Sequence, residues 1–168
     1  MSRITARVAA MQMIFEKISG GQGGEDTLKM VYDELREDGL PGVEHIGRKE
    51  PDGEDREYIT AALDGVLAHR DEIDELIGKN TAKGWSIDRI SLVNLTIMRL
   101  AVWEILYAED VPGNVSIAEA LELTERFSDP EDKSFVNGIL GTILREKPLR
   151  CALASLLSVP RSECSRSP

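Results

Sequence analysis

The chain has 168 residues, of which 42% are hydrophobic, and it carries a formal net charge of −10. This length and apolar content suffice for one domain with a buried core, and no apolar run approaches the roughly 18 residues that a membrane-spanning helix needs. The negative charge disfavours a generic nucleic-acid binder, because contacts with phosphate groups require cations.

Composition also predicts the fold class and the compartment. Strand patterns are nearly absent and aromatic residues make up 5% of the chain, so we predict an all-α fold. The N-terminus lacks the apolar core and cleavage site of a signal peptide, which predicts a cytoplasmic protein. Cys151 and Cys164 both lie near the C-terminus, where neither a disulfide framework nor a zinc site is expected.

Charge is distributed unevenly along the chain. Residues 21–80 hold 17 acidic and 7 basic side chains, whereas residues 1–20 hold three basic side chains and one acidic side chain. The N-terminal segment is therefore a positively charged island next to an acidic one.

Apolar spacing predicts helices in the first half of the chain. The glycine-rich stretch 20–24 ends the first helix, and residues 39–53 are expected to form a long, mobile loop. The predicted helical segments are 4–18, 28–39 and 58–78, the last as one helix or two.

The next predicted helix, residues 92–107, is apolar on nearly every side, which is typical of a helix around which others pack. Ser91 is placed to cap it, after a short turn or helix at 85–90. Arg99 falls on an apolar face, while the polar Asn94 and Glu104 are each about 140° away around the helix. The counter-ion of Arg99 must therefore come from another helix or from another chain.

Two further helices are predicted after a break at residues 111–113. Ser116 and Glu119 have the spacing of a capping box, which would open a helix that ends at Phe127. Asp129 and Pro130 have the pattern of an N-cap followed by a first-turn proline.

The last helix is expected to end at about residue 147, so the predicted domain spans residues 1–147. We expect residues 148–168 to form a disordered tail, or at most a short helix.

Catalysis is poorly supported. No glutamate pairs with His45 or His69 at metal-ligand spacing, and no glycine-rich loop follows a strand. The acid pairs at 71–72 and 74–75 have the pattern of a solvated helix face. We therefore predict a protein that is not an enzyme and that holds no metal or cofactor.

Two surfaces are candidates for nucleic-acid contact. On the first helix, Arg3, Arg7 and Lys17 fall on one flank of the apolar stripe beside Phe15. Cations next to an aromatic ring suit single-stranded RNA. The alternative is three ordinary surface cations, and composition alone favours that alternative.

The second surface is a strip of small and polar residues on the last helix, formed by Ser134, Asn137, Gly138 and Gly141. Glycine inside a helix costs about 1 kcal/mol relative to alanine, so the two glycines indicate that another helix or an RNA strand approaches the backbone. Lys133 and Asn137 flank this strip and are placed to donate to phosphates or base edges.

Five motifs follow one another in a fixed order: 6–15 (ARVAAMQMIF), 85–90 (WSIDRI), 98–105 (MRLAVWEI), 111–120 (VPGNVSIAEA) and 135–138 (FVNG). In sequence and order they resemble the NusB family of transcription antitermination factors. The resemblance covers about residues 3–147 and implies a fold of about seven helices in two packed sub-bundles, without catalysis.

The resemblance also implies partners. Family members bind the boxA element, a single-stranded RNA sequence in ribosomal RNA leader transcripts, together with NusE, a small-subunit ribosomal protein. The complex joins RNA polymerase and suppresses termination. Carried over by position, the RNA contacts are Arg3, Arg7, Gln12, Phe15, Glu131, Lys133 and Phe135, to which the strip adds Asn137.

The same resemblance implies that NusE docks on the surface around Arg99, with Asp88 and Asn94 as further members. Two alternatives stay open. One is a helical module that binds only proteins, which the acidic balance suggests. The other is a detached NusB-like domain of a ribosomal RNA cytosine methyltransferase.

Overall fold

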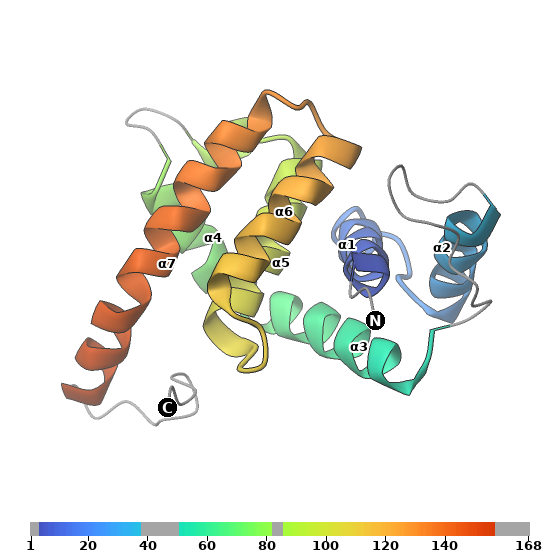
Figure 1. Ribbon diagram of the computed structural model, residues 1–168, viewed down its shortest axis with the longest axis horizontal. Helices are drawn as coiled ribbons and strands as arrows, with labels where there is room; N and C mark the ends of the chain where they lie inside the picture. The colour runs from blue at the N-terminus through green and yellow to red at the C-terminus, as the bar shows by residue number, and fades with distance from the viewer. Residues whose placement is uncertain (1–3, 38–50, 82–85, 157–168) are drawn as a thin grey trace. The chain divides into compact units, whose positions relative to one another are not determined.

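The computed structural model describes residues 4–37, 51–81 and 86–156. These residues form seven α-helices and one short 3-10 helix, and no strand occurs among them (Figure 1). The chain divides into two compact units, Met1–Ala68 and His69–Pro168. The predicted all-α fold is confirmed.

The first unit contains α1 (Ile4–Ile18), α2 (Glu25–Glu37) and α3 (Gly53–Ala68), and α1 packs against both of the others. Its core is apolar and draws on all three helices, with Val8, Ile14, Val31, Ile59 and Val66 among its members. Every residue of α1 from Ile4 to Met11 is buried. The first half of this helix therefore lacks the solvent-facing side that the amphipathic pattern predicts.

Local signals explain the end of α1 and the start of α3. Gly20 adopts φ 91°, its backbone N–H donates to the Lys17 carbonyl (3.3 Å), and that of Gly21 donates to the Glu16 carbonyl (2.9 Å). This arrangement is a Schellman motif, for which glycine is preferred because of the positive φ. At the start of α3, the backbone N–H of Asp55 donates to Asp52 Oδ1 at 2.9 Å, which caps the helix.

The second unit contains α4 (Arg70–Lys79), η1 (Ile87–Arg89), α5 (Leu92–Tyr107), α6 (Gly113–Phe127) and α7 (Asp132–Leu156). Helix α5 contacts α4, α6 and α7, and each of its residues from Asn94 to Ile105 is buried. The predicted central helix is therefore confirmed, and so is its cap, because Ser91 Oγ accepts a hydrogen bond from the Asn94 backbone at 3.2 Å.

The predicted capping box of α6 is wrong. The helix already begins at Gly113, with Pro112 as its N-cap, and the backbone N–H groups of Val115 and Ser116 both donate to the Pro112 carbonyl. Proline suits this position, because its restricted φ fits the extended N-cap and its missing N–H has no helical acceptor there. Ser116 is consequently an internal residue of α6 instead of its N-cap, and its side chain is buried.

Both ends of α7 also differ from the prediction. The segment Asp129–Pro130 forms a turn, in which the Asp132 backbone donates to the Asp129 carbonyl, and the helix begins at Asp132. At the other end, α7 continues past Pro148 to Leu156. Proline removes one backbone hydrogen bond, but the alanines and leucines that follow it are strong helix formers.

Three predictions fall partly or wholly outside the described residues. They concern residues 157–168 of the expected tail, most of the expected loop at 39–53, and Trp85 in the second motif. Within the described residues, none of the helices has the length and apolar content that spanning a membrane would require.

Candidate nucleic-acid interface

The start of α7 gathers four of the predicted RNA-contacting residues in the second unit. Glu131 and Asn137 are exposed, whereas Lys133 and Phe135 are half-buried. Lys133 Nζ lies 2.5 Å from Glu125 Oε2 of α6, and this hydrogen bond lowers the pKa of Glu125. The cation nearest to the start of α7 therefore already has an acidic neighbour.

Neither Gly138 nor Gly141 of α7 lies at a close contact with another helix. A Cβ atom added to Gly138 would meet no atom within 4 Å, and one added to Gly141 would meet only Arg145 Nη1 at 3.5 Å. By contrast, a Cβ on Gly113 would lie 2.4 Å from Leu144 Cδ1, so the close approach of α6 to α7 occurs at that glycine. Within the described residues, the backbone at Gly138 is open to a ligand.

The predicted RNA contacts of the first unit are less accessible. Arg3 lies outside the described residues, while Gln12 and Phe15 are half-buried. Arg7 is only 3% exposed, and its guanidinium carbon lies 5.9 Å from the ring centroid of Tyr58. Lys17 is exposed and donates to the Gln22 carbonyl at 3.0 Å. Arg7 is therefore not the solvent-exposed cation that the positive flank predicts, because the packing of α1 buries its side chain, and its contact with RNA stays a prediction.

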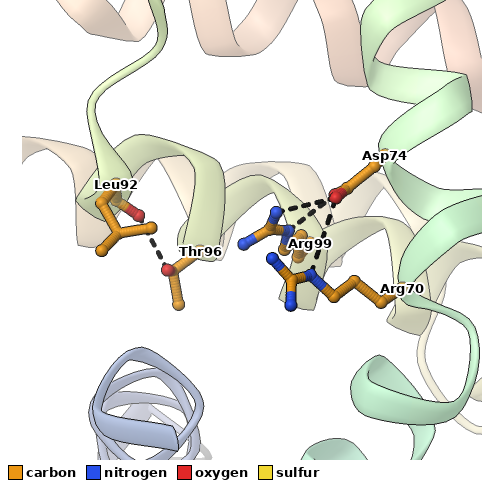
Figure 2. A network of polar contacts seen from close by, with 5 residues as sticks. All are labelled: Arg70, Asp74, Leu92, Thr96 and Arg99. Carbon is orange, nitrogen blue, oxygen red and sulfur yellow. Dashed lines mark hydrogen bonds and ion pairs between the residues drawn. The ribbon is translucent and has the colours of Figure 1, made fainter. Parts of the chain in front are cut away.

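Arg99 finds its counter-ion within the same chain. Its Nε and Nη2 atoms donate to the two carboxylate oxygens of Asp74 on α4, at 2.6 and 2.8 Å (Figure 2). Arg70 Nε lies 3.8 Å from the same carboxylate. Of the two sources that the sequence left open, another helix is the correct one. Since Arg99 is 2% exposed, a contact between its own guanidinium and NusE stays only a prediction.

The prediction that Asp74 lies on a solvated helix face is wrong. Ile77, three residues after Asp74 and therefore on the same side of α4, is fully buried, so that side carries both an apolar residue and this carboxylate. That neighbourhood was the available signal. Figure 2 also shows the buried Thr96, whose hydroxyl donates to the Leu92 carbonyl of its own helix at 2.7 Å.

The two other predicted partner-binding residues differ in exposure. Asp88 of η1 is exposed and accepts a hydrogen bond from Ser86 Oγ at 3.0 Å. Asn94 is 3% exposed, and its side-chain amide donates to Asp132 Oδ2 at 2.6 Å. Asp88 is thus available to a partner, whereas Asn94 connects α5 to α7.

In the part of the chain that the structure describes, no cluster of histidine, cysteine or carboxylate side chains could hold a metal ion. His45 lies outside the described residues. The ring of His69 stacks on that of Tyr107 with centroids 4.2 Å apart, and the Tyr107 hydroxyl donates to Glu72 at 2.7 Å. These contacts join the start of α4 to the end of α5.

Comparisons with known proteins agree with the fold. A family model described as the NusB family matches residues 4–145. The transcription antitermination protein NusB of Clostridium botulinum (strain Alaska E43 / Type E3) is 40% identical over 146 residues, which cover 87% of this chain and all of that relative.

Among solved structures, T. maritima NusB has a TM-score of 0.66 at 28% identity, covering 87% of this chain and 92% of that one. A chain of the crystal structure of antitermination factors NusB and NusE in complex with dsRNA has a TM-score of 0.65 at 24% identity. This second match covers 86% of this chain and 98% of that one, and it supports the fold. With a family model over most of its length and a relative matched in full, the chain belongs to the NusB family.

Proposed function

We propose that this chain is a transcription antitermination factor, without catalytic activity, that acts in the cytoplasm. It binds boxA-type RNA of ribosomal RNA leader transcripts together with NusE, and the complex helps RNA polymerase to read through terminators. The observation that carries the proposal is the 40% identity to a transcription antitermination protein NusB over that protein's whole length. The fold is also shared with a chain of a complex of NusB, NusE and dsRNA.

The start of α7 has the side chains that this function needs. Asn137 is exposed and can donate to a base edge, and the half-buried Phe135 offers a ring on which a base can stack. The open backbone at Gly138 leaves room for a strand. These features support RNA contact at this end of the second unit.

The charges support a role for a protein partner. Lys133 is paired with Glu125, Arg7 is buried, and the net charge is −10. Each of these features weakens the attraction of the chain for phosphate groups. RNA binding is therefore expected to depend on NusE, which would supply further contacts and offset the acidic field.

The test is a comparison of two RNAs of equal length and composition, one with a boxA-like sequence and one scrambled, each titrated into the chain with saturating NusE at fixed salt. We expect the boxA-like RNA to bind at least about tenfold more tightly. Equal affinities would contradict sequence-specific antitermination. NusE binding without any RNA binding would instead favour the protein-only module.

A further inference from the structure

We propose that Asp132 is a positioning residue for RNA binding, because it fixes the first turn of α7 against α5 and against the end of α6. The inference depends on the proposed function and concerns how the RNA-contacting turn is held. Asp132 itself need not touch the RNA. Its effect on RNA binding is indirect, because it holds in place Glu131, Lys133 and Phe135, which lie beside it at the start of α7.

One oxygen atom of Asp132 carries the arrangement. Its Oδ2 accepts a hydrogen bond from Asn94 Nδ2 of α5 at 2.6 Å and another from Ser128 Oγ, at the C-cap of α6, at 3.0 Å. Asn94 is itself fixed at the first turn of α5 by the cap from Ser91. The carboxylate of Asp132 in α7 thus connects α7 to α5 and to the end of α6.

The surroundings of Asn94 indicate that its side chain serves the hydrogen bond to Asp132. Asn94 is 3% exposed, and its Oδ1 atom is buried without a hydrogen-bond partner among the described residues. Leaving a buried acceptor unsatisfied destabilises a protein. The carbonyl of this amide therefore lowers stability, whereas its donor, directed at Asp132, makes a hydrogen bond between α5 and α7.

The charge of Asp132 allows a sharp test. If the carboxylate influenced RNA only through its charge, every neutral substitution would strengthen RNA binding by removing repulsion from phosphate. If it positions the turn, the outcome depends on whether an acceptor remains. Because both donors converge on one oxygen, the side-chain carbonyl of an asparagine can accept both hydrogen bonds.

The experiment compares Asp132→Ala, Asp132→Asn and Asn94→Ala, with Asn80→Ala as the matched control. Asn80 is also an amide of the second unit, and it donates to the Leu76 carbonyl at 3.0 Å. The affinity for boxA-like RNA is measured with saturating NusE, at a temperature at which circular dichroism shows each variant to be folded. The affinity of each variant for NusE alone is measured in parallel.

We expect Asp132→Ala and Asn94→Ala to bind RNA roughly tenfold more weakly, the loss that a charge-assisted hydrogen bond of about 1.4 kcal/mol would cause. Asp132→Asn and Asn80→Ala should stay within about twofold of wild type, and Asp132→Ala should keep its affinity for NusE. The rescue by asparagine separates positioning from charge.

Four results would overturn the inference. Tighter RNA binding by both Asp132 variants would assign the effect to charge, and equal losses in Asp132→Asn and Asp132→Ala would show that the acceptor geometry is not what matters. Unchanged affinity in Asp132→Ala would exclude positioning while leaving the proposed function intact. Failure of the wild-type chain to bind RNA with NusE would remove the proposed function, and this inference with it.

Discussion

Arg99 and Asp74 form a buried ion pair in which the two partners differ in exposure. The side chain of Arg99 is 3% exposed, whereas that of Asp74 is 25% exposed and has Arg70 as a second cationic neighbour. Breaking such a pair is costly mainly because the remaining charge stays buried without compensation. The cost should therefore depend on which partner is removed.

We predict that Asp74→Ala lowers the free energy of unfolding by about 3–5 kcal/mol, because it leaves the Arg99 charge buried without its carboxylate. Arg99→Ala should cost less, about 1–3 kcal/mol, since Asp74 can be solvated and stays near Arg70. Urea unfolding of the two variants measures the difference. A larger loss in Arg99→Ala would show that the pair is not limited by the buried arginine.

Tyr32 provides a pH-dependent test in the first unit. Its side chain is buried, and burial together with the carboxylates of Asp55 and Asp52 raises the pKa of its hydroxyl. The folded state thus holds the neutral phenol, while the unfolded state ionises near the ordinary pKa of about 10. The stabilisation is complete below that pH and decreases as the pH rises above it.

We predict that the free energy of unfolding of the wild-type chain falls more steeply above about pH 10 than that of Tyr32→Phe, which has no phenol to ionise. Chemical denaturation at several pH values between about 8 and 11 measures both slopes. Parallel curves for the two proteins would mean that the Tyr32 hydroxyl ionises equally easily in the folded state.

Single residues also show the limit of sequence-based prediction. The burial of Arg99 follows from its apolar neighbours on one helix, and this prediction is confirmed. The identity of its counter-ion does not follow, because Asp74 is distant in sequence and meets Arg99 only when α4 packs on α5. The family resemblance places Asn94 on a partner surface, but its contact with Asp132 cannot be predicted from the sequence, because that contact depends on how α7 begins.

At the scale of helices, apolar periodicity predicted more than capping patterns did. The bounds predicted for α1 and α5 agree with the structure, since both helices are long and clearly bounded by Ser91 or by glycines. The predicted start of α6 was wrong because the helix already begins at Gly113, three residues before Ser116, with Pro112 as an N-cap that makes no side-chain hydrogen bond. A capping pattern in the sequence does not exclude an earlier start, since each further helical residue adds a backbone hydrogen bond.

The two serines of these helices allow a direct test. Ser91 Oγ caps α5, so Ser91→Ala should lower the free energy of unfolding by about 1 kcal/mol. Ser116 is buried inside α6 and its hydroxyl has no partner among the described residues. Ser116→Ala should therefore leave stability unchanged or raise it by up to about 1 kcal/mol. A decrease in the free energy of unfolding for Ser116→Ala similar to that for Ser91→Ala would instead support the predicted capping box.

For the whole molecule, net charge is the property that most affects the proposed function. A chain with a net charge of −10 repels RNA at long range. Two of its candidate phosphate contacts are weakened further, because Arg7 is buried and Lys133 is paired with Glu125. The molecule should therefore bind RNA weakly alone and require NusE for tight binding.

The most direct measurement is a titration of boxA-like RNA into the chain at fixed salt, repeated with saturating NusE. We predict at least about tenfold tighter RNA binding in the presence of NusE, equivalent to roughly 1.4 kcal/mol of coupling. By reciprocity, saturating RNA should tighten the binding of NusE to the chain by the same factor. Equal RNA affinities with and without NusE would contradict the cooperative account.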